Sequence, residues 1–129
     1  SLEGVKVPLC AIACETDHIA HWRGSFNGVK QMGSTDKTFI VSQSGHIAGI
    51  INPPSKGKYG HYTNDGPVSG APDDWMKAAS FTAGSWWPRW GAWLDERSGG
   101  QIPARQIGDS GHPELCPAPG TYVVSKPAD

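Results

Sequence analysis

The feature that most constrains the fold is an almost unbroken apolar run at residues 7–14, Val-Pro-Leu-Cys-Ala-Ile-Ala-Cys. The run has the length of a β-strand, and its apolar side chains would project from both faces of a sheet. Such a strand is typical of a parallel sheet that is covered on both faces by helices. Pro8 is tolerated because it lies near the strand start, where a missing N–H costs least. The run therefore predicts an α/β fold.

A second strand-like run follows at residues 37–43, which are rich in β-forming side chains. Between the two runs, residues 19–33 carry apolar side chains at spacings of four and three, on one face of a helix: Trp22, Phe26 and Val29. Strand, helix and strand in this order predict a βαβ unit with two parallel strands.

The second half of the chain is less regular. Residues 73–82 begin with two acidic residues and predict a helix. A second helix is expected to follow Ser85 and to end at Gly99-Gly100. Residues 121–125 favour a short strand. The predicted organisation then comprises four segments: a βαβ unit at 1–51, a long loop at 52–72, Trp-rich helices at 73–100 and an irregular tail at 101–129.

Length and charge exclude several classes of protein. The chain has 129 residues, fewer than the roughly 200–250 of a complete α/β enzyme, and it starts at Ser1, so we expect a processed or excised piece. Its net charge of −1 argues against nucleic acid as a partner. No apolar run approaches the roughly 20 residues of a membrane span. The three cysteines make a poor disulfide framework, which favours a reducing, intracellular setting.

Two chemistry-bearing residues follow the two predicted strands. Asp17 comes just after the first strand, and His46 just after the second. The carboxyl ends of parallel strands meet at one edge of a sheet, where ligands bind, and neighbouring strands lie about 4.8 Å apart. Loops that follow these strands can therefore bring Asp17 and His46 into hydrogen-bond range. Their order along the chain matches the last two members of an α/β-hydrolase triad, in which the carboxylate orients a histidine base.

Other interpretations of these residues stay open. Asp17 could simply cap the following helix, and His46 could be an ordinary loop histidine, because no G-x-S-x-G or G-x-C-x-G nucleophile motif occurs in the chain. The cysteines at 10 and 14 lie in the apolar run and are expected to be buried and inert. A zinc site that uses His18 and His21 is not favoured, because structural zinc sites usually combine cysteines and histidines at tight spacing. His61 and His112 are expected to be solvated.

A cluster of tryptophans is the remaining feature. Trp86, Trp90 and Trp93 share one face of the second predicted helix, and Trp75 precedes them. A stripe of this kind is more often core than ligand platform, so we expect Trp90 and Trp93 to be structural. An aromatic platform for a polymer, a sugar or a nucleotide base is the functional alternative.

Several blocks of the chain, in order, resemble segments of polyhydroxyalkanoate synthases. Residues 17–22 are similar to the D-H-I-x-x-W block of that family. Residues 44–54, Ser-Gly-His-Ile-Ala-Gly-Ile-Ile-Asn-Pro-Pro, resemble its G-H-I-A-G block, in a form that looks like the class I, short-chain enzymes. Residues 62–65, 84–94 and 117–123 look like its closing segments. The resemblance covers essentially the whole chain.

The resemblance implies that residues 1–129 are the incomplete C-terminal portion of an α/β-hydrolase-type catalytic domain. It implies a Cys-Asp-His triad in which Asp17 and His46 are the catalytic residues of this chain. The cysteine would lie upstream, because Cys10, Cys14 and Cys116 are not flanked by the required glycines. The chain alone is therefore expected to be inactive.

The implied reaction of the parent protein is acyl transfer. An (R)-3-hydroxyacyl-CoA, in the first place 3-hydroxybutyryl-CoA, would be polymerised into polyhydroxyalkanoate with release of coenzyme A. No metal and no tightly bound cofactor are implied, because coenzyme A arrives as part of the substrate. The implied partners are the growing polyester chain, the surface of a cytoplasmic polymer granule and the remainder of the catalytic domain. The resemblance is compatible with a homodimeric parent.

Two rival functions remain at this point. An esterase or depolymerase of the same fold would use the same Asp–His pair with a serine nucleophile. A non-catalytic binding module would use the tryptophan surface instead. A serine nucleophile motif upstream would favour the esterase or depolymerase, and a cysteine motif would favour the acyltransferase. Titration of a polymer or sugar against the tryptophan fluorescence would test the binding module.

Overall fold

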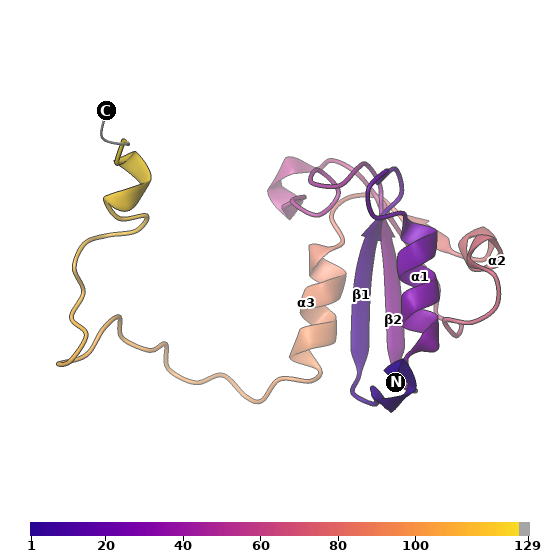
Figure 1. The fold of residues 1–129 in the computed structure, drawn as a ribbon, viewed down its shortest axis with the longest axis horizontal. Helices are drawn as coiled ribbons and strands as arrows, with labels where there is room; N and C mark the ends of the chain where they lie inside the picture. Colours follow the sequence, from indigo (N-terminus) through magenta and orange to yellow (C-terminus); the bar gives the residue numbers. More distant parts are fainter. Residues whose placement is uncertain (127–129) are drawn as a thin grey trace. The chain divides into compact units, whose positions relative to one another are not determined.

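The computed structural model describes residues 1–126 of the chain (Figure 1). These residues form two units, which we describe separately: Ser1–Ser98 and the part of the chain that follows it. The secondary structure of the first unit is mixed α/β. Among the described residues, no helix combines the length and the apolar character that a membrane crossing requires.

The first unit is built on a four-stranded mixed sheet. Its strands are β1 (Leu9–Cys14), β2 (Lys37–Ser42), β3 (His61–Thr63) and β4 (Ser80–Thr82), in the spatial order β1-β2-β3-β4. The predicted parallel pair is confirmed, because β1 lies parallel to β2 with Leu9 opposite Lys37. The other two pairs, β2–β3 and β3–β4, are antiparallel. The sheet is therefore mixed rather than wholly parallel.

The two antiparallel strands correct the sequence interpretation. β3 lies inside the segment 52–72, which we expected to be a loop, and β4 replaces the end of the helix expected at 73–82. That helix, α2 (Pro72–Lys77), is shorter than predicted. Each of these strands has only three residues, too few for an alternating pattern to be recognised.

Helix α1 (Trp22–Gln31) covers one face of the β1–β2 pair. It buries Trp22, Phe26 and Val29, the three residues that the periodicity predicted. Phe26 meets Phe39 of β2 edge to face, with ring centroids 5.3 Å apart. Trp75 from α2 packs against both rings, at 5.7 and 5.4 Å. This aromatic cluster is the centre of the core and holds α1 and α2 on the sheet.

Strand β1 differs from the expectation of burial on both faces. It lies at the edge of the four-stranded sheet, and its residues up to Ile12 are only partly buried. Val7 precedes the strand and is 64% exposed. The reason is that, within the described residues, β2 is the one strand hydrogen-bonded to β1.

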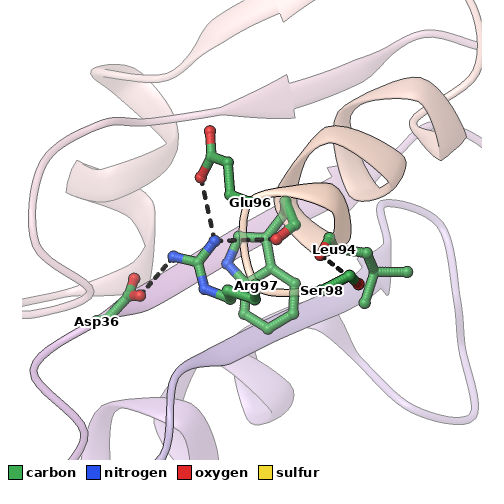
Figure 2. Close-up of polar contacts among 6 residues, drawn as sticks. Asp36, Leu94, Glu96, Arg97 and Ser98 are labelled. Carbon is green, nitrogen blue, oxygen red and sulfur yellow. Dashed lines mark hydrogen bonds and ion pairs between the residues drawn. The ribbon is translucent and has the colours of Figure 1, made fainter. Parts of the chain in front are cut away.

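Helix α3 (Trp87–Asp95) lies on the side of the β1–β2 pair away from α1 (Figure 1). Its last turn is tied to the start of β2 by Arg97, which donates to the carboxylate of Asp36 and to the carbonyl of Trp93 (Figure 2). The same guanidinium stacks over the Trp93 ring at 4.3 Å. Nearby, Ser98 Oγ donates to the carbonyl of Leu94 at 2.8 Å. These contacts anchor the C-terminal end of α3. The helix ends at Asp95, before the end predicted at Gly99-Gly100.

The tryptophan stripe is only partly a core feature. Trp75 and Trp86 are buried, Trp93 is half-buried, and Trp90 is 40% exposed. The expectation that Trp90 is a core residue is therefore wrong in this structure. Its ring contacts Trp86 at 5.8 Å, and α3 has no fully buried residue.

The second unit, described to residue 126, contains one 3₁₀ helix, η3 (Tyr122–Val124). The short strand predicted at 121–125 is therefore absent, and this helical turn takes its place. The remainder of the described tail has no regular secondary structure, and its large apolar side chains are exposed. The last three residues of the predicted tail, 127–129, lie outside the described residues.

The packing predicts which tryptophan stabilises the fold. Replacement of Trp75 by Ala should lower the free energy of unfolding by about 3–5 kcal/mol, because it removes the ring that joins α2 to Phe26 and Phe39. Trp90→Ala is the matched control and should cost less than half as much, because that ring is already partly in water. Denaturant unfolding of the two variants measures the difference. Equal losses would contradict the packing described here.

Candidate active site

The parallel strands bring two loops together at the carboxyl edge of the sheet. Pairing continues past the strand ends, since Glu15 N donates to Ser42 O at 2.8 Å and Thr16 N donates to Ser44 O at 3.1 Å. The loop after β1 is thus fixed against the loop after β2. Asp17 is the next residue of the first loop, and His46 lies in the second.

Asp17 and His46 are in direct contact. His46 Nδ1 lies 2.8 Å from Asp17 Oδ2, so the two loops do bring these side chains into hydrogen-bond range. The other carboxylate oxygen, Oδ1, accepts from the backbone N–H groups of Ile19 at 2.8 Å and Ala20 at 2.9 Å. Asp17 does not cap α1, whose N-cap residue is His21. Oδ1 instead stabilises the turn that follows Asp17, and Oδ2 binds the imidazole of His46.

These contacts make Asp17 a permanent anion at neutral pH. The N–H of Ala20, then the imidazole of His46 and the N–H of Ile19, lower the pKa of the carboxyl to about 2, although burial acts in the opposite direction. The carboxylate is 6% exposed. A buried anion with three N–H partners is well suited to orient and stabilise an imidazolium.

The imidazole of His46 is held on one side and open on the other. Its side chain is 51% exposed, against 7% for Asp17. With the Nδ1 proton directed to the carboxylate, the neutral ring carries its lone pair on Nε2. This tautomer is assigned from the hydrogen-bond network. The arrangement is suited to a base: the imidazole is half exposed to solvent, and the carboxylate of Asp17 orients it.

The loop that carries His46 is compact, and Gly49 allows its backbone to lie close to Cys14 and Gln43. Gly49 N donates to Gly45 O at 3.0 Å, and Ile51 N donates to Ile47 O at 2.8 Å, which closes a single turn around the histidine. A Cβ on Gly49 would lie 2.6 Å from Cys14 Sγ and 2.7 Å from Gln43 O. Ser44, at the loop entry, has a left-handed backbone with φ of 74°, a conformation that costs free energy in a non-glycine residue.

Ser42 is a supporting residue that the sequence interpretation missed. It is fully buried, and its Oγ donates to Gly49 O at 2.8 Å. A polar residue at the end of a buried strand is the signal that could have identified it, because a buried hydroxyl requires a partner.

A groove of about 360 Å³ adjoins the His46 loop, lined by Ile47, Ala48, Ile51, Asn52, Lys56, Lys58 and Tyr59. Asn52, one of the lining residues, is fully buried and donates from Nδ2 to Tyr59 O at 3.1 Å. Its Oδ1 has no hydrogen-bond partner among the described residues. The groove combines apolar walls with two ammonium groups.

The remaining cysteines and histidines that the sequence offered lie apart from the Asp17–His46 pair or are unreactive. Burial raises the pKa of the Cys10 and Cys14 thiols, so both are poor nucleophiles at neutral pH. Cys116 is exposed and belongs to the second unit. His18 and His21 are also exposed. Within residues 1–126, no three His, Cys, Asp or Glu side chains gather as a metal-binding group.

One histidine differs from its prediction. His61 was expected in a solvated loop, but it is 4% exposed in β3, and its Nδ1 lies 3.0 Å from Gly84 O. The error follows from the unrecognised strand. His112 is exposed in the second unit, as expected.

Fold and site together define a mixed α/β protein with a carboxylate-oriented histidine at the carboxyl edge of a parallel strand pair. No protein-family model matches the chain. The chain is 41% identical over 126 residues to the poly(3-hydroxyalkanoate) polymerase subunit PhaC of Rhizobium etli, and this match covers 98% of the chain and 20% of that protein.

Two other relatives agree with this match. The poly(3-hydroxyalkanoate) polymerase of Methylorubrum extorquens is 44% identical over 97% of the chain. The PhaC subunit of Cupriavidus necator is 36% identical over 97% of the chain. The chain spans about a fifth of the length of these curated relatives. It is homologous to a segment of the poly(3-hydroxyalkanoate) polymerases, which confirms the resemblance noted in the sequence.

The hydrogen bonds of Asp17 predict its titration. Its carboxyl should titrate near pH 2, whereas an unfolded Asp titrates near about 3.9. Because the folded pKa is the lower one, the carboxylate stabilises the fold fully above about pH 4, and this stabilisation is lost as the pH falls through about 2. Carboxyl ¹³C chemical shifts measure the titration. His46→Ala should raise the pKa of Asp17 but leave it below the ordinary value, and an ordinary value in the unmodified protein would contradict the contacts.

Proposed function

We propose that this chain supplies the aspartate and the histidine of a Cys-Asp-His triad to a polyhydroxyalkanoate polymerase. The complete polymerase, meaning the longer protein that would contain this chain, joins (R)-3-hydroxyacyl units from their coenzyme A thioesters. The 2.8 Å contact between His46 Nδ1 and Asp17 Oδ2 carries the proposal, and the homology to the polymerases supports it. In this proposal the chain is the C-terminal portion of an α/β-hydrolase fold.

The first half-reaction charges the enzyme. His46 Nε2 takes the proton of a cysteine thiol, which the remainder of the catalytic domain supplies. The thiolate attacks the thioester carbonyl, the bond from carbon to the coenzyme A sulfur breaks, and the leaving thiolate takes up the proton from His46. The products are an acyl-enzyme and free coenzyme A, with the imidazole neutral again.

The second half-reaction lengthens the polymer. The 3-hydroxyl of another unit gives its proton to His46 and attacks the acyl-enzyme, so an ester bond forms as the bond to the cysteine breaks. The leaving cysteine thiolate takes the proton from His46, which restores the thiol and the neutral imidazole. The structure favours His46 over Asp17 as the base in this step. Both oxygens of Asp17 already accept hydrogen bonds, and a carboxylate with a pKa of about 2 is a weak base.

The groove beside His46 suits the substrate class. Lys56 and Lys58 offer positive charge to the phosphates of coenzyme A, and the walls at Ile47 and Ile51 offer apolar contact to an acyl chain. In the same proposal the polymer leaves toward a granule surface. Cys10 and Cys14 do not serve as the nucleophile because burial raises their pKa.

His46→Ala in the complete polymerase should lower the rate of coenzyme A release at least a thousandfold, because one group performs both proton transfers. Release is followed with a thiol reagent and 3-hydroxybutyryl-CoA. The control is His112→Ala, which removes an exposed histidine of the second unit and should leave the rate unchanged. A His46→Ala enzyme that keeps a tenth of the rate would contradict the assignment.

Asp17→Asn should lose most activity in both half-reactions, because an amide in that place no longer fixes the imidazole tautomer. A pre-steady-state burst of coenzyme A separates the first acylation from chain growth. If Asp17 orients His46, the burst rate and the steady rate fall together. A normal burst followed by arrested elongation would instead assign Asp17 to activation of the 3-hydroxyl.

A further inference from the structure

Two adjacent indoles hold the loop that carries His46. Trp86 Nε1 donates to the carbonyl of Gly49 at 2.9 Å, and Trp87 Nε1 donates to the carbonyl of Ile50 at 3.0 Å. Neighbouring tryptophans thus bind neighbouring carbonyls, and each bond joins residues 37 positions apart in the sequence. Trp86 is 6% exposed, so its bond is shielded from water.

The carbonyls that the indoles hold belong to the same turn as the histidine. Gly49 N donates to Gly45 O, and the N–H groups of Ile50 and Ile51 both donate to Ile47 O. His46 lies between these bonded positions. A displacement of Gly49 or Ile50 therefore displaces the backbone from which the imidazole projects.

The two indoles are themselves fixed relative to the sheet. Trp87 is the first residue of α3, and Trp86 comes directly before it. The other end of α3 is tied through Arg97 to Asp36, which directly precedes β2 (Figure 2). Helix α3 is thus anchored at its far end to the strand whose carboxyl end leads into the His46 loop.

We propose that Trp86 and Trp87 are positioning residues for His46, which act by holding the Gly49 and Ile50 carbonyls so that the imidazole stays at the distance that proton transfer requires. This inference rests on the proposed function, in which His46 is the base. The hydrogen bond that His46 Nδ1 donates to Asp17 fixes one nitrogen of the ring but does not by itself hold the backbone at Gly49 and Ile50. A shift of about 1 Å at a reacting group can cost on the order of a hundredfold in rate.

A purely structural role for these N–H groups is the competing explanation, since buried donors usually find a partner. The chain itself argues against it. Trp75 Nε1 and Trp93 Nε1 are also buried, and neither has a hydrogen-bond partner among the described residues. The fold therefore tolerates indole donors without acceptors, whereas both donors that reach the His46 loop are paired.

The test compares three single variants of the complete polymerase. Trp86→Phe and Trp87→Phe each keep an aromatic ring and remove the donor, and Trp93→Phe on the same helix removes a donor that has no acceptor among the described residues. We expect the first two to lower kcat for coenzyme A release about tenfold or more, with KM within about twofold. Trp93→Phe should leave kcat within about twofold. An equal loss of kcat in all three variants would overturn the proposal.

Ring size is separated from the N–H group by isosteres of tryptophan at position 86. β-(3-Benzothienyl)alanine keeps the bicyclic shape and has sulfur in place of the N–H, whereas 5-fluorotryptophan keeps the N–H. The sulfur isostere should show the loss of kcat, and the fluorinated residue should not. Equal activity of the two proteins would mean that only packing matters and would overturn the proposal.

A double-mutant cycle separates this inference from the proposed function. If Trp86 acts through His46, Trp86→Phe should cost nothing further in a His46→Ala background. The same fold-loss in both backgrounds would overturn the positioning role while His46 keeps its assignment. A fully active His46→Ala enzyme would overturn the proposed function itself, together with the inference that rests on it.

Discussion

The parallel pairing of β1 with β2 is the constraint on which the site depends. Cys14 lies opposite Ser42, and two further backbone hydrogen bonds continue the pairing into the loops. Asp17 and His46 are 29 residues apart in the sequence, yet the register leaves little freedom in their separation. A slip of one residue would turn every side chain of the strand to the opposite face of the sheet. Packing of Phe26 and Trp75 against Phe39 stabilises this register from one face.

The same pairing determines the electrostatics of the site. Once Asp17 lies at the strand end, its carboxylate receives two backbone N–H groups and the imidazole, and its pKa falls to about 2. Three donors leave it little capacity to accept a proton, so the proposed mechanism gives the two residues separate roles. Asp17 supplies fixed negative charge, and His46 is the group proposed to transfer protons. Burial of one and exposure of the other reinforce this division.

The sequence predicted the elements that are long enough to show a periodic pattern of apolar residues. β1, α1 and β2 are regular segments, and the rule that ligands bind at the carboxyl edge of parallel strands was enough to pair Asp17 with His46. β3 and β4 are too short to show a period, and the burial of His61 followed from β3. The exposure of Trp90 was missed because a helical stripe identifies one face of a helix but not how much of the sheet that face covers.

The supporting contacts of the site have a different origin from the Asp–His pair. The His46 loop is irregular, and its backbone is held by bonds from distant positions: the hydroxyl of Ser42 and the indoles of Trp86 and Trp87. Gly49 accepts two of these bonds, and the absence of a side chain there lets the loop approach Cys14. No local pattern encodes such contacts, because each needs residues from separate elements. The Trp-rich second half of the chain therefore contributes to the support of the histidine loop, and the Asp–His pair depends on α3 as well as on the two strands that carry it.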